Sequence, residues 1–177
     1  IRDSLLPDDR APRLTVKWPN DIYFDDLKIC GILIECQLEG RTLSSAIAGI
    51  GININQRRFV SDAPNPVSLA QIIGCETQLE PLLDDIAAAL DAALTAYIAA
   101  PDPQRLLANF RERQWRSEGL HHWRDKITGE VIEASIIDVA ADGPMTLRLA
   151  DGTERTYAFK EIAAIITSPT RPTFERF

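Results

Sequence analysis

The segment that decides the fold is residues 17–35, which read KWPNDIYFDDLKICGILIE. The strand expected over residues 13–18 ends at a proline, because proline cannot donate a hydrogen bond to a β-ladder. The Asp-Asp pair that follows is typical of a hairpin turn, so residues 22–24 and 29–38 are predicted to pair as antiparallel strands. The second arm is apolar on both faces through Ile34, which predicts a central strand covered on both sides.

A second strand is predicted at residues 44–55, SSAIAGIGININ. Because strand side chains alternate between the two faces, one face is wholly apolar, with Ala46, Ala48, Ile50, Ile52 and Ile54. The other face carries Gly49 and Gly51, followed by Asn53 and Asn55. Glycine weakens a strand, so two at alternate positions indicate that something lies flat on the sheet there. The apolar face is therefore expected to be core. The face with Gly49 and Gly51 is expected to be an open surface on which a ligand can lie, and we call it the glycine floor.

The remainder of the chain divides into helices and then strands. A short helix is expected at residues 68–74, and a longer one begins near Pro81. Asp102 is an N-cap candidate for a third helix with Pro103 at its first position. Apolar side chains on these helices fall on stripes that are expected to be buried scaffold: Leu83, Ile86, Ala87, Leu90, Ala93, Leu94, Tyr97 and Ile98 on the second helix, and Leu106, Leu107 and Phe110 on the third. From about Asp125, short strands and turns predict a small β-barrel that docks on the preceding domain.

Composition excludes several classes of protein. The 177 residues are 45% hydrophobic and 25% charged, with a net charge of −7 and a pI near 4.9. This acidity argues against broad binding to nucleic acid or anionic membranes, and no apolar run is long enough to span a bilayer. Three cysteines without a CxxC pair favour reduced thiols in the cytoplasm. The chain begins with Ile1 in what reads as the end of a helix, so we expect a fragment of a longer polypeptide.

Four residues around the hairpin could carry chemistry. Lys17 and Lys28 flank the turn, and Asn20 and Asp21 lie between them. Taken singly, each is ordinary turn or surface material. Together with the glycine floor, two converging lysines could neutralise a phosphate and a carboxylate, as the activation of a carboxylic acid by a nucleoside triphosphate requires. Asp21 could then hold Mg²⁺ on the phosphates or orient a lysine.

Other polar residues leave alternatives open. Asn53 could read an adenine edge or merely cap a strand, and the two readings are equal on spacing alone. Trp18 is interpreted as packing rather than a stacking platform. Glu35 lies among apolar residues and is interpreted as structural or as a support for the site. The two histidines His121 and His122 are adjacent in sequence, which is poor geometry for a shared metal, so a zinc site is not expected.

The two segments KWPNDIYFDDLKICGILIE and IAGIGININ resemble the biotin protein ligase family. Its members carry Lys-Trp-Pro-Asn-Asp, Lys-x-x-Gly-x-Leu-x-Glu and Gly-x-Gly-x-Asn-x-Asn in this order and at this spacing. The resemblance implies an α+β fold with a mixed or antiparallel sheet and packed helices, as in class II synthetases, followed by a small SH3-like barrel. The implied domains are residues 1–120 for the C-terminal portion of the catalytic domain and 121–168 for the SH3-like domain, with a tail at 169–177.

The resemblance also implies an activity. Family members form biotinyl-5′-AMP from biotin and ATP with Mg²⁺, and then transfer biotin to a lysine of a biotin carboxyl carrier domain. By this likeness Lys28 contacts the biotin carboxylate and the α-phosphate, and Asn53 reads the adenine. The likeness also implies that Lys17, Asn20 and Asp21 lie on the side of the site that holds the phosphates and magnesium. Gly31 would let the backbone approach biotin closely. Gly49 and Gly51 would belong to the substrate-binding floor.

The chain departs from the family pattern in two places. The Gly-Arg-Gly-Arg-x-Gly-Arg loop that family members carry upstream is missing, and Lys160-Glu161 replaces a Gly-Glu of many barrels. A DNA-binding domain is also missing, so no DNA partner is expected. Alternatives are a lipoate-type ligase or octanoyltransferase of the same fold, or a non-catalytic interaction fragment. Lost upstream strands would leave a sheet edge unpaired, so self-association or aggregation of this chain in isolation is predicted, and a homodimer is one form that it could take.

Overall fold

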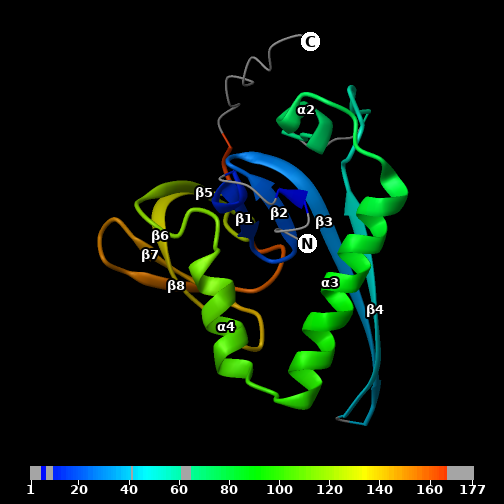
Figure 1. Cartoon of the computed structure of the whole chain (residues 1–177). Helices are drawn as coiled ribbons and strands as arrows, with labels where there is room; N and C mark the ends of the chain where they lie inside the picture. The colour runs from blue at the N-terminus through cyan, green and yellow to red at the C-terminus, as the bar shows by residue number, and fades with distance from the viewer. Residues whose placement is uncertain (1–4, 7–9, 41, 61–64, 167–177) are drawn as a thin grey trace.

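The computed structural model describes residues 5–6, 10–40, 42–60 and 65–166, and shows an α+β protein with two antiparallel sheets (Figure 1). The first sheet is a meander in chain order, formed by β1 (Leu14–Lys17), β2 (Asp21–Phe24), β3 (Leu27–Glu39) and β4 (Thr42–Ile52). The predicted hairpin is therefore confirmed, with β3 extended by a few residues. Among the described residues, no helix is long and apolar enough to span a membrane.

The helices begin where the sequence predicts. A 3₁₀ turn, η1 (Ala11–Arg13), precedes β1, and the α-helices are α2 (Leu69–Ile73), α3 (Leu79–Ala99) and α4 (Pro103–Glu112). Ser68 caps α2 in a reciprocal pair with Gln71, and Asp102 caps α4 by accepting a hydrogen bond from the Arg105 N–H. These caps satisfy backbone donors that a helix leaves unpaired at its first turn.

The first core lies on one face of the first sheet. Its buried residues are Leu5, Leu6, Ala11, Leu14, Phe24, Leu27, Ile29, Cys30, Val67, Leu69, Leu82 and Ile86, with Ile32, Ile50 and Ile52 partly buried against them. The apolar face predicted for β4 is thus core at its C-terminal end. Ala46 and Ala48 on the same face are exposed, so that prediction is wrong for the far end of the strand.

The second sheet has the strand order β8-β7-β6-β5-β9 and is open, so the prediction of a closed SH3-like barrel is not confirmed. Its strands are β5 (His121–Asp125), β6 (Val131–Val139), β7 (Met145–Leu149), β8 (Glu154–Tyr157) and β9 (Ile162–Ala164). The strands at its two ends, β8 and β9, have four and three residues and do not pair with each other. Closure would require that pairing. The division into residues 1–120 and 121–168 stays a prediction.

The two sheets are tied together at the turn between β1 and β2. The Trp18 indole N–H donates to the Gly143 carbonyl at 2.8 Å, and Trp18 packs on the core of the second sheet. On the other side, Arg111 of α4 donates to the Val139 carbonyl at 2.9 Å and forms an ion pair with Asp138. Trp18 therefore packs as the sequence predicted, and it does so across the contact between the sheets.

Exposed apolar side chains on β3, α3 and α4 show that two predictions of burial are wrong. Leu33 and Ile34 of β3 are 63% and 59% exposed, so this strand is not covered on both sides. In α3 only Leu82 and Ile86 are buried, and α4 has no buried residue. The rest of the predicted stripe is largely exposed, including Leu83, Leu90, Leu94, Ile98 and Leu106. The physical reason is that β3 and β4 extend beyond the first core, and no other described residues form a layer over these faces (Figure 1).

Candidate functional site

A β-bulge brings Lys28 onto the glycine face of the first sheet. Asp21 pairs with Gly31 and Ile22 with Cys30, but Tyr23 pairs with Lys28, so β3 carries one extra residue at this point. Simple alternation from Gly31 would put Lys28 on the opposite, core-facing side. Bulges re-aim side chains in this way and are common beside functional sites. The bulge therefore converts an inward position into one facing the floor.

The Lys28 ammonium is held by Asp21 above Gly31. The distance from Lys28 Nζ to Asp21 Oδ1 is 2.6 Å, and the two side chains are 31% and 16% exposed. A Cβ atom placed on Gly31 would lie 3.2 Å from Lys28 Nζ and 3.4 Å from Asp21 Oδ1. Gly31 thus leaves room for the ion pair directly over the backbone. The structure brings together these three residues, which the sequence singled out.

Lys17 lies beside the same carboxylate but deeper in the protein. Its Nζ is 3.9 Å from Asp21 Oδ2 and 5.4 Å from the centre of the Tyr23 ring. Lys17 also lines a cavity of about 20 Å³ between the sheets, with Trp18, Trp115, Trp123, Ile136, Met145, Ile162 and Ala164. Burial lowers the pKa of Lys17, the charge of Asp21 raises it, and Lys28 and Arg116 lower it further. Its position between the sheets favours a supporting role over direct contact with a ligand on the open floor.

Replacing Lys17 by Met should leave the melting temperature unchanged or raise it at neutral pH. Because the folded-state pKa is lowered, charged Lys17 costs folding free energy below that pKa, and the cost disappears as the pH rises toward the unfolded value of about 10.5. The advantage of Lys17→Met should therefore shrink from pH 7 to pH 10 in thermal unfolding. Lys126→Met, at an exposed lysine, is the matched control. A large loss of stability in Lys17→Met, or an advantage that grows with pH, would contradict this account.

The floor beside this ion pair is open. Gly49 and Gly51 are exposed and face the same side as Gly31 and Leu33, their partners in the register. A Cβ atom on Gly49 or Gly51 would meet only a carbonyl oxygen at 3.8 Å, so neither glycine is required by packing. An open recess of about 360 Å³ lies next to it and is lined by Trp18, Pro19, Asn20, Ile32, Leu33, Ile34, Asp142, Gly143, Pro144, Ala158 and Phe159. Its size and mostly apolar lining suit part of a small organic ligand.

The remaining predicted site residues are engaged with the backbone or exposed. The Asn20 side-chain amide donates to the Ile32 carbonyl at 2.5 Å, so it ties the turn to β3. The Asn53 amide reaches the Lys28 carbonyl at 3.4 Å, at the edge of the floor, and is half-buried. Asn55 is bonded in both directions to the Thr77 backbone. Glu35 is exposed and therefore needs no buried partner, and its role as a structural residue or a support for the site stays a prediction.

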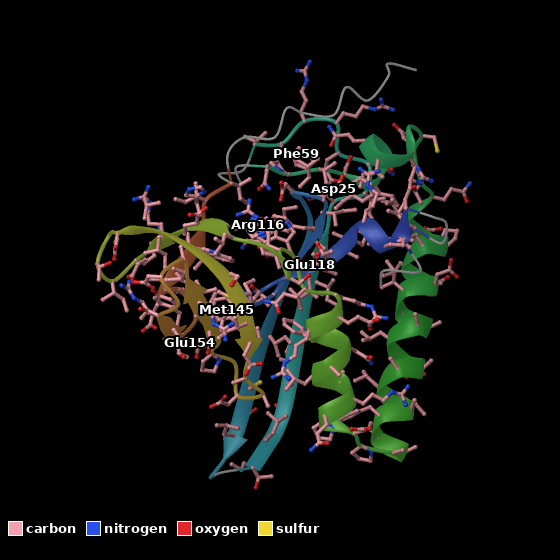
Figure 2. The ribbon with its side chains drawn as sticks, turned by 90° about the vertical axis from the view of Figure 1, so that its left-hand side faces the viewer. Asp25, Phe59, Arg116, Glu118, Met145 and Glu154 are labelled. Carbon is pink, nitrogen blue, oxygen red and sulfur yellow. The ribbon has the colours of Figure 1, made fainter. Side chains whose placement is uncertain are left out.

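Sequence reasoning missed an aromatic and charged cluster behind Lys17. Trp115 packs on Tyr23 with ring centres 5.2 Å apart, and its indole donates to Asp26 at 3.0 Å. Arg116 stacks on Trp115 at 4.0 Å and donates to the Ile165 carbonyl, where the second sheet meets the first (Figure 2). Burial raises the pKa of Tyr23 to about 12, which keeps it neutral. The only sequence signal was a Trp-Arg pair after α4.

The site residues do not fit a protein-built magnesium site. Asp21 is already paired with Lys28 and lies close to Lys17, and two nearby ammonium groups disfavour a cation. Among the described residues, no group of three or more His, Cys, Asp or Glu could hold a metal. Magnesium often binds through substrate phosphates with few protein ligands. The interpretation of Asp21 as the residue that orients a lysine is the one that the geometry favours.

Comparisons with known proteins find a family whose sequence profile matches the segment that carries this geometry. The sequence profile described as "Biotin/lipoate A/B protein ligase family" matches residues 5–53. This segment includes the Lys28–Asp21 ion pair, the strands β3 and β4 that carry the floor glycines, and Asn53. Over these residues the chain is similar to this family. The Escherichia coli "Bifunctional ligase/repressor BirA" is 44% identical over 57 residues, which are 31% of this chain and 17% of BirA. The "Biotin--[acetyl-CoA-carboxylase] ligase" of Paracoccus denitrificans is 34% identical over 98 residues, 51% of this chain and 41% of that protein.

Solved structures extend the likeness to the whole fold. The apo biotin protein ligase of Aquifex aeolicus aligns with a TM-score of 0.69 at 19% identity, over 93% of this chain and 71% of that one. The same ligase "in complex with biotin and ATP" aligns with a TM-score of 0.66, over 92% and 66% of the two chains. At this identity the likeness concerns the fold alone. The matched regions cover less than half of the two curated relatives described above.

Proposed function

We propose that this chain belongs to the biotin/lipoate ligase family and acts in biotin protein ligation. Biotin and ATP would react to form biotinyl-5′-AMP, and the biotinyl group would pass to a lysine of a biotin carboxyl carrier domain. The observation that carries the proposal is the Lys28 ammonium, held by Asp21 above Gly31 at the border of an open glycine floor. These residues lie within the segment that the family profile matches.

In the first step a carboxylate oxygen of biotin attacks the α-phosphorus of ATP, and the bond to the bridging oxygen breaks to release pyrophosphate. Two anions must approach each other, and further negative charge develops on the α-phosphoryl oxygens. We propose that Lys28 neutralises both, and its partly exposed ammonium at the floor supports this role. Asp21 keeps the ammonium in position until the ligands arrive. Positioning and charge neutralisation then supply most of the rate enhancement.

In the second step the amine of a carrier lysine attacks the acyl carbon of biotinyl-5′-AMP. The bond to the phosphate oxygen breaks, AMP leaves, and an amide forms with loss of the amine proton. No covalent enzyme intermediate is needed. The exposed surface around Gly49 and Gly51 supports this step, since a carrier lysine must reach the acyl group from solvent. Asn53, at the edge of the floor, is the proposed contact for adenine.

Lipoate is the alternative acid within the same family. Because the curated relatives described above are a biotin ligase and BirA, biotin is the acid we propose. With the chain of 177 residues, we expect biotin-dependent exchange of pyrophosphate into ATP, and binding of biotinyl-5′-AMP by calorimetry. Lipoate should not support pyrophosphate exchange, and its adenylate, lipoyl-AMP, should not bind. Exchange with lipoate but not with biotin would overturn the assignment of biotin as the substrate. If neither biotinyl-5′-AMP nor lipoyl-AMP bound, the proposed site itself would be wrong.

A further inference from the structure

The bulge in β3 turns two neighbouring backbone carbonyl groups toward the same side of the strand. In a regular antiparallel strand, neighbouring carbonyl groups point to opposite sides. Here the Lys28 carbonyl accepts a hydrogen bond from the Val67 N–H at 2.9 Å, and the Ile29 carbonyl accepts one from the Asn53 N–H at 2.9 Å. Asn53 follows β4, and Val67 bonds Lys28 opposite its β2 partner, so both donors lie on the side of β3 away from β2. The bulge therefore depends on donors from outside the β2–β3 hairpin.

Asn65 holds the beginning of β3 at two points. Its backbone carbonyl accepts a hydrogen bond from the Lys28 N–H at 2.9 Å, so both backbone polar groups of Lys28 are bonded to residues 65–67. Its side-chain amide donates to the carbonyl of Asp26, in the two-residue turn between β2 and β3. Asn65 is 5% exposed, so water has little access to either bond. Asn65 thus connects the turn and the bulge.

The side chain of Asn65 also carries a buried polar atom that is unpaired in the described part of the chain. Its Oδ1 accepts no hydrogen bond from any described residue. A buried acceptor without a donor lowers stability, and an apolar side chain of similar shape would avoid that cost. Stability alone therefore does not explain an asparagine at this position. The Nδ2 group, which fastens the turn at Asp26, is the feature that an apolar side chain could not supply.

We propose that Asn65 is a positioning residue that keeps Lys28 on the face of the glycine floor. By fastening both the turn at Asp26 and the backbone of Lys28, it holds the bulge closed, and the bulge directs the Lys28 side chain over Gly31. Without the bulge, simple alternation would turn Lys28 toward the core-facing side. The consequence for the reaction rests on the proposed function, whereas the consequence for the position of Lys28 does not.

The bonds from residues 65–67 also leave the Asn53 side chain available to a ligand. The Asn53 amide reaches the Lys28 carbonyl at 3.4 Å, which is longer than the 2.9 Å bond that the same carbonyl accepts from the Val67 N–H. If Asn53 turns toward adenine, as the proposed function requires, the Val67 and Asn65 bonds still hold the backbone of Lys28. Nucleotide binding and the placement of the ammonium are therefore compatible.

Replacing Asn65 by Ala tests the consequence for catalysis in the chain of 177 residues. We expect kcat for biotin-dependent exchange of pyrophosphate into ATP to fall by about tenfold to a hundredfold, as for a misplaced catalytic group. The KM for ATP should stay the same, because Asn65 contacts no ligand in this proposal. Asn65→Leu removes both polar atoms and fills the space that Ala leaves, so it should show the same loss of kcat. Circular dichroism should show the fold unchanged in both variants.

Gln71→Ala is the matched control in the same segment. It removes the reciprocal cap with Ser68 at the start of α2. The melting temperature should fall, because the cap satisfies N–H groups of the first helical turn. The bonds that are lost lie within α2 and do not reach β3, so kcat should stay the same. An equal loss of kcat in Gln71→Ala would show that Asn65 acts only through stability, and would overturn the proposal.

A double variant decides whether Asn65 acts through Lys28. Lys28→Ala combined with Asn65→Ala should be no slower than Lys28→Ala alone, because no ammonium remains to be positioned. Losses that multiply would show that Asn65 acts by another route, which would contradict the proposal.

Nuclear magnetic resonance of the ligand-free chain tests the position of Lys28 without relying on catalysis. With isotope-labelled lysine, only four side chains contribute signals, namely Lys17, Lys28, Lys126 and Lys160. The Lys28 signal is identified by its loss in Lys28→Ala. It should move toward the signal of exposed Lys126 in both Asn65 variants, and stay in place in Gln71→Ala. An unmoved Lys28 signal in both Asn65 variants would overturn the proposal. If the unmodified chain shows no exchange, the proposed function is wrong, and these spectra still decide the position of Lys28.

Discussion

Lys28→Ala should lower biotin-dependent pyrophosphate exchange by about 10²–10³, the cost of removing one preorganised charge donor at a developing oxyanion. The reason is geometric. Lys28 is the partly exposed cation at the floor, 2.6 Å from Asp21, while Lys17 is turned toward the cavity between the sheets. Removing Lys28 leaves biotin and ATP to approach without a neutralising charge between them. The loss should appear mainly in kcat, since negative charge grows in the transition state.

The control for this variant is Lys126→Ala, at an exposed lysine of the second sheet region. It lowers the net charge by the same amount and should leave exchange and stability unchanged. Thermal unfolding of Lys28→Ala should stay close to that of the unmodified chain, because Lys28 is not buried. Exchange at the normal rate in a folded Lys28→Ala protein would show that the catalytic cation is another residue.

Much of the fold was predictable because its local signals are strong. Pro19 after a short apolar run, Asp102 before Pro103, and the alternation of Gly49 and Gly51 each have one favoured structural outcome. The structure accordingly has the hairpin, the cap of α4 and a glycine face on β4. These features depend on a few neighbouring residues, so sequence alone carries them.

The bulge and the depth of Lys17 could not be predicted from the same signals. Nothing in the letters around Lys28 marks an extra residue in β3, yet that residue decides which face Lys28 occupies. Lys17 and Lys28 are equivalent in a linear reading. Packing of Trp115 and Trp123 from distant segments separates them, because these side chains enclose Lys17 and leave Lys28 at the floor. Long-range packing is invisible to spacing rules.

The prediction that the apolar stripe of α3 is buried was wrong for a related reason. Periodicity in α3 correctly indicates an apolar stripe, but it cannot state what covers that stripe. Leu82 and Ile86 meet the first core, whereas Leu94 and Ile98 lie beyond it. An apolar stripe on a helix indicates a surface that favours burial. It does not identify the segment or the protein that covers that surface.

Gly31→Ala should displace the Lys28 ammonium without unfolding the protein. The added Cβ would approach Lys28 Nζ to 3.2 Å and Asp21 Oδ1 to 3.4 Å, which is tight, but the end of a lysine side chain can move away. We expect an unchanged melting temperature, a KM for biotin raised about tenfold and a lower kcat. Gly49→Ala is the control for stability, since its Cβ would meet only the Leu33 carbonyl at 3.8 Å.

The two glycine variants separate two reasons for a bare backbone. If Gly31 is needed for the ion pair, nuclear magnetic resonance of the Lys28 ammonium should change in Gly31→Ala even without ligand, and should not change in Gly49→Ala. A ligand lying on the floor would instead make both variants lose biotin affinity while the free-state Lys28 signal stayed the same. Unaltered kinetics and an unaltered Lys28 signal in Gly31→Ala would contradict the placement of Lys28 above Gly31. The prediction therefore depends on the bulge in β3, because without it Lys28 would lie on the other face and the methyl group added by Gly31→Ala would meet no cation.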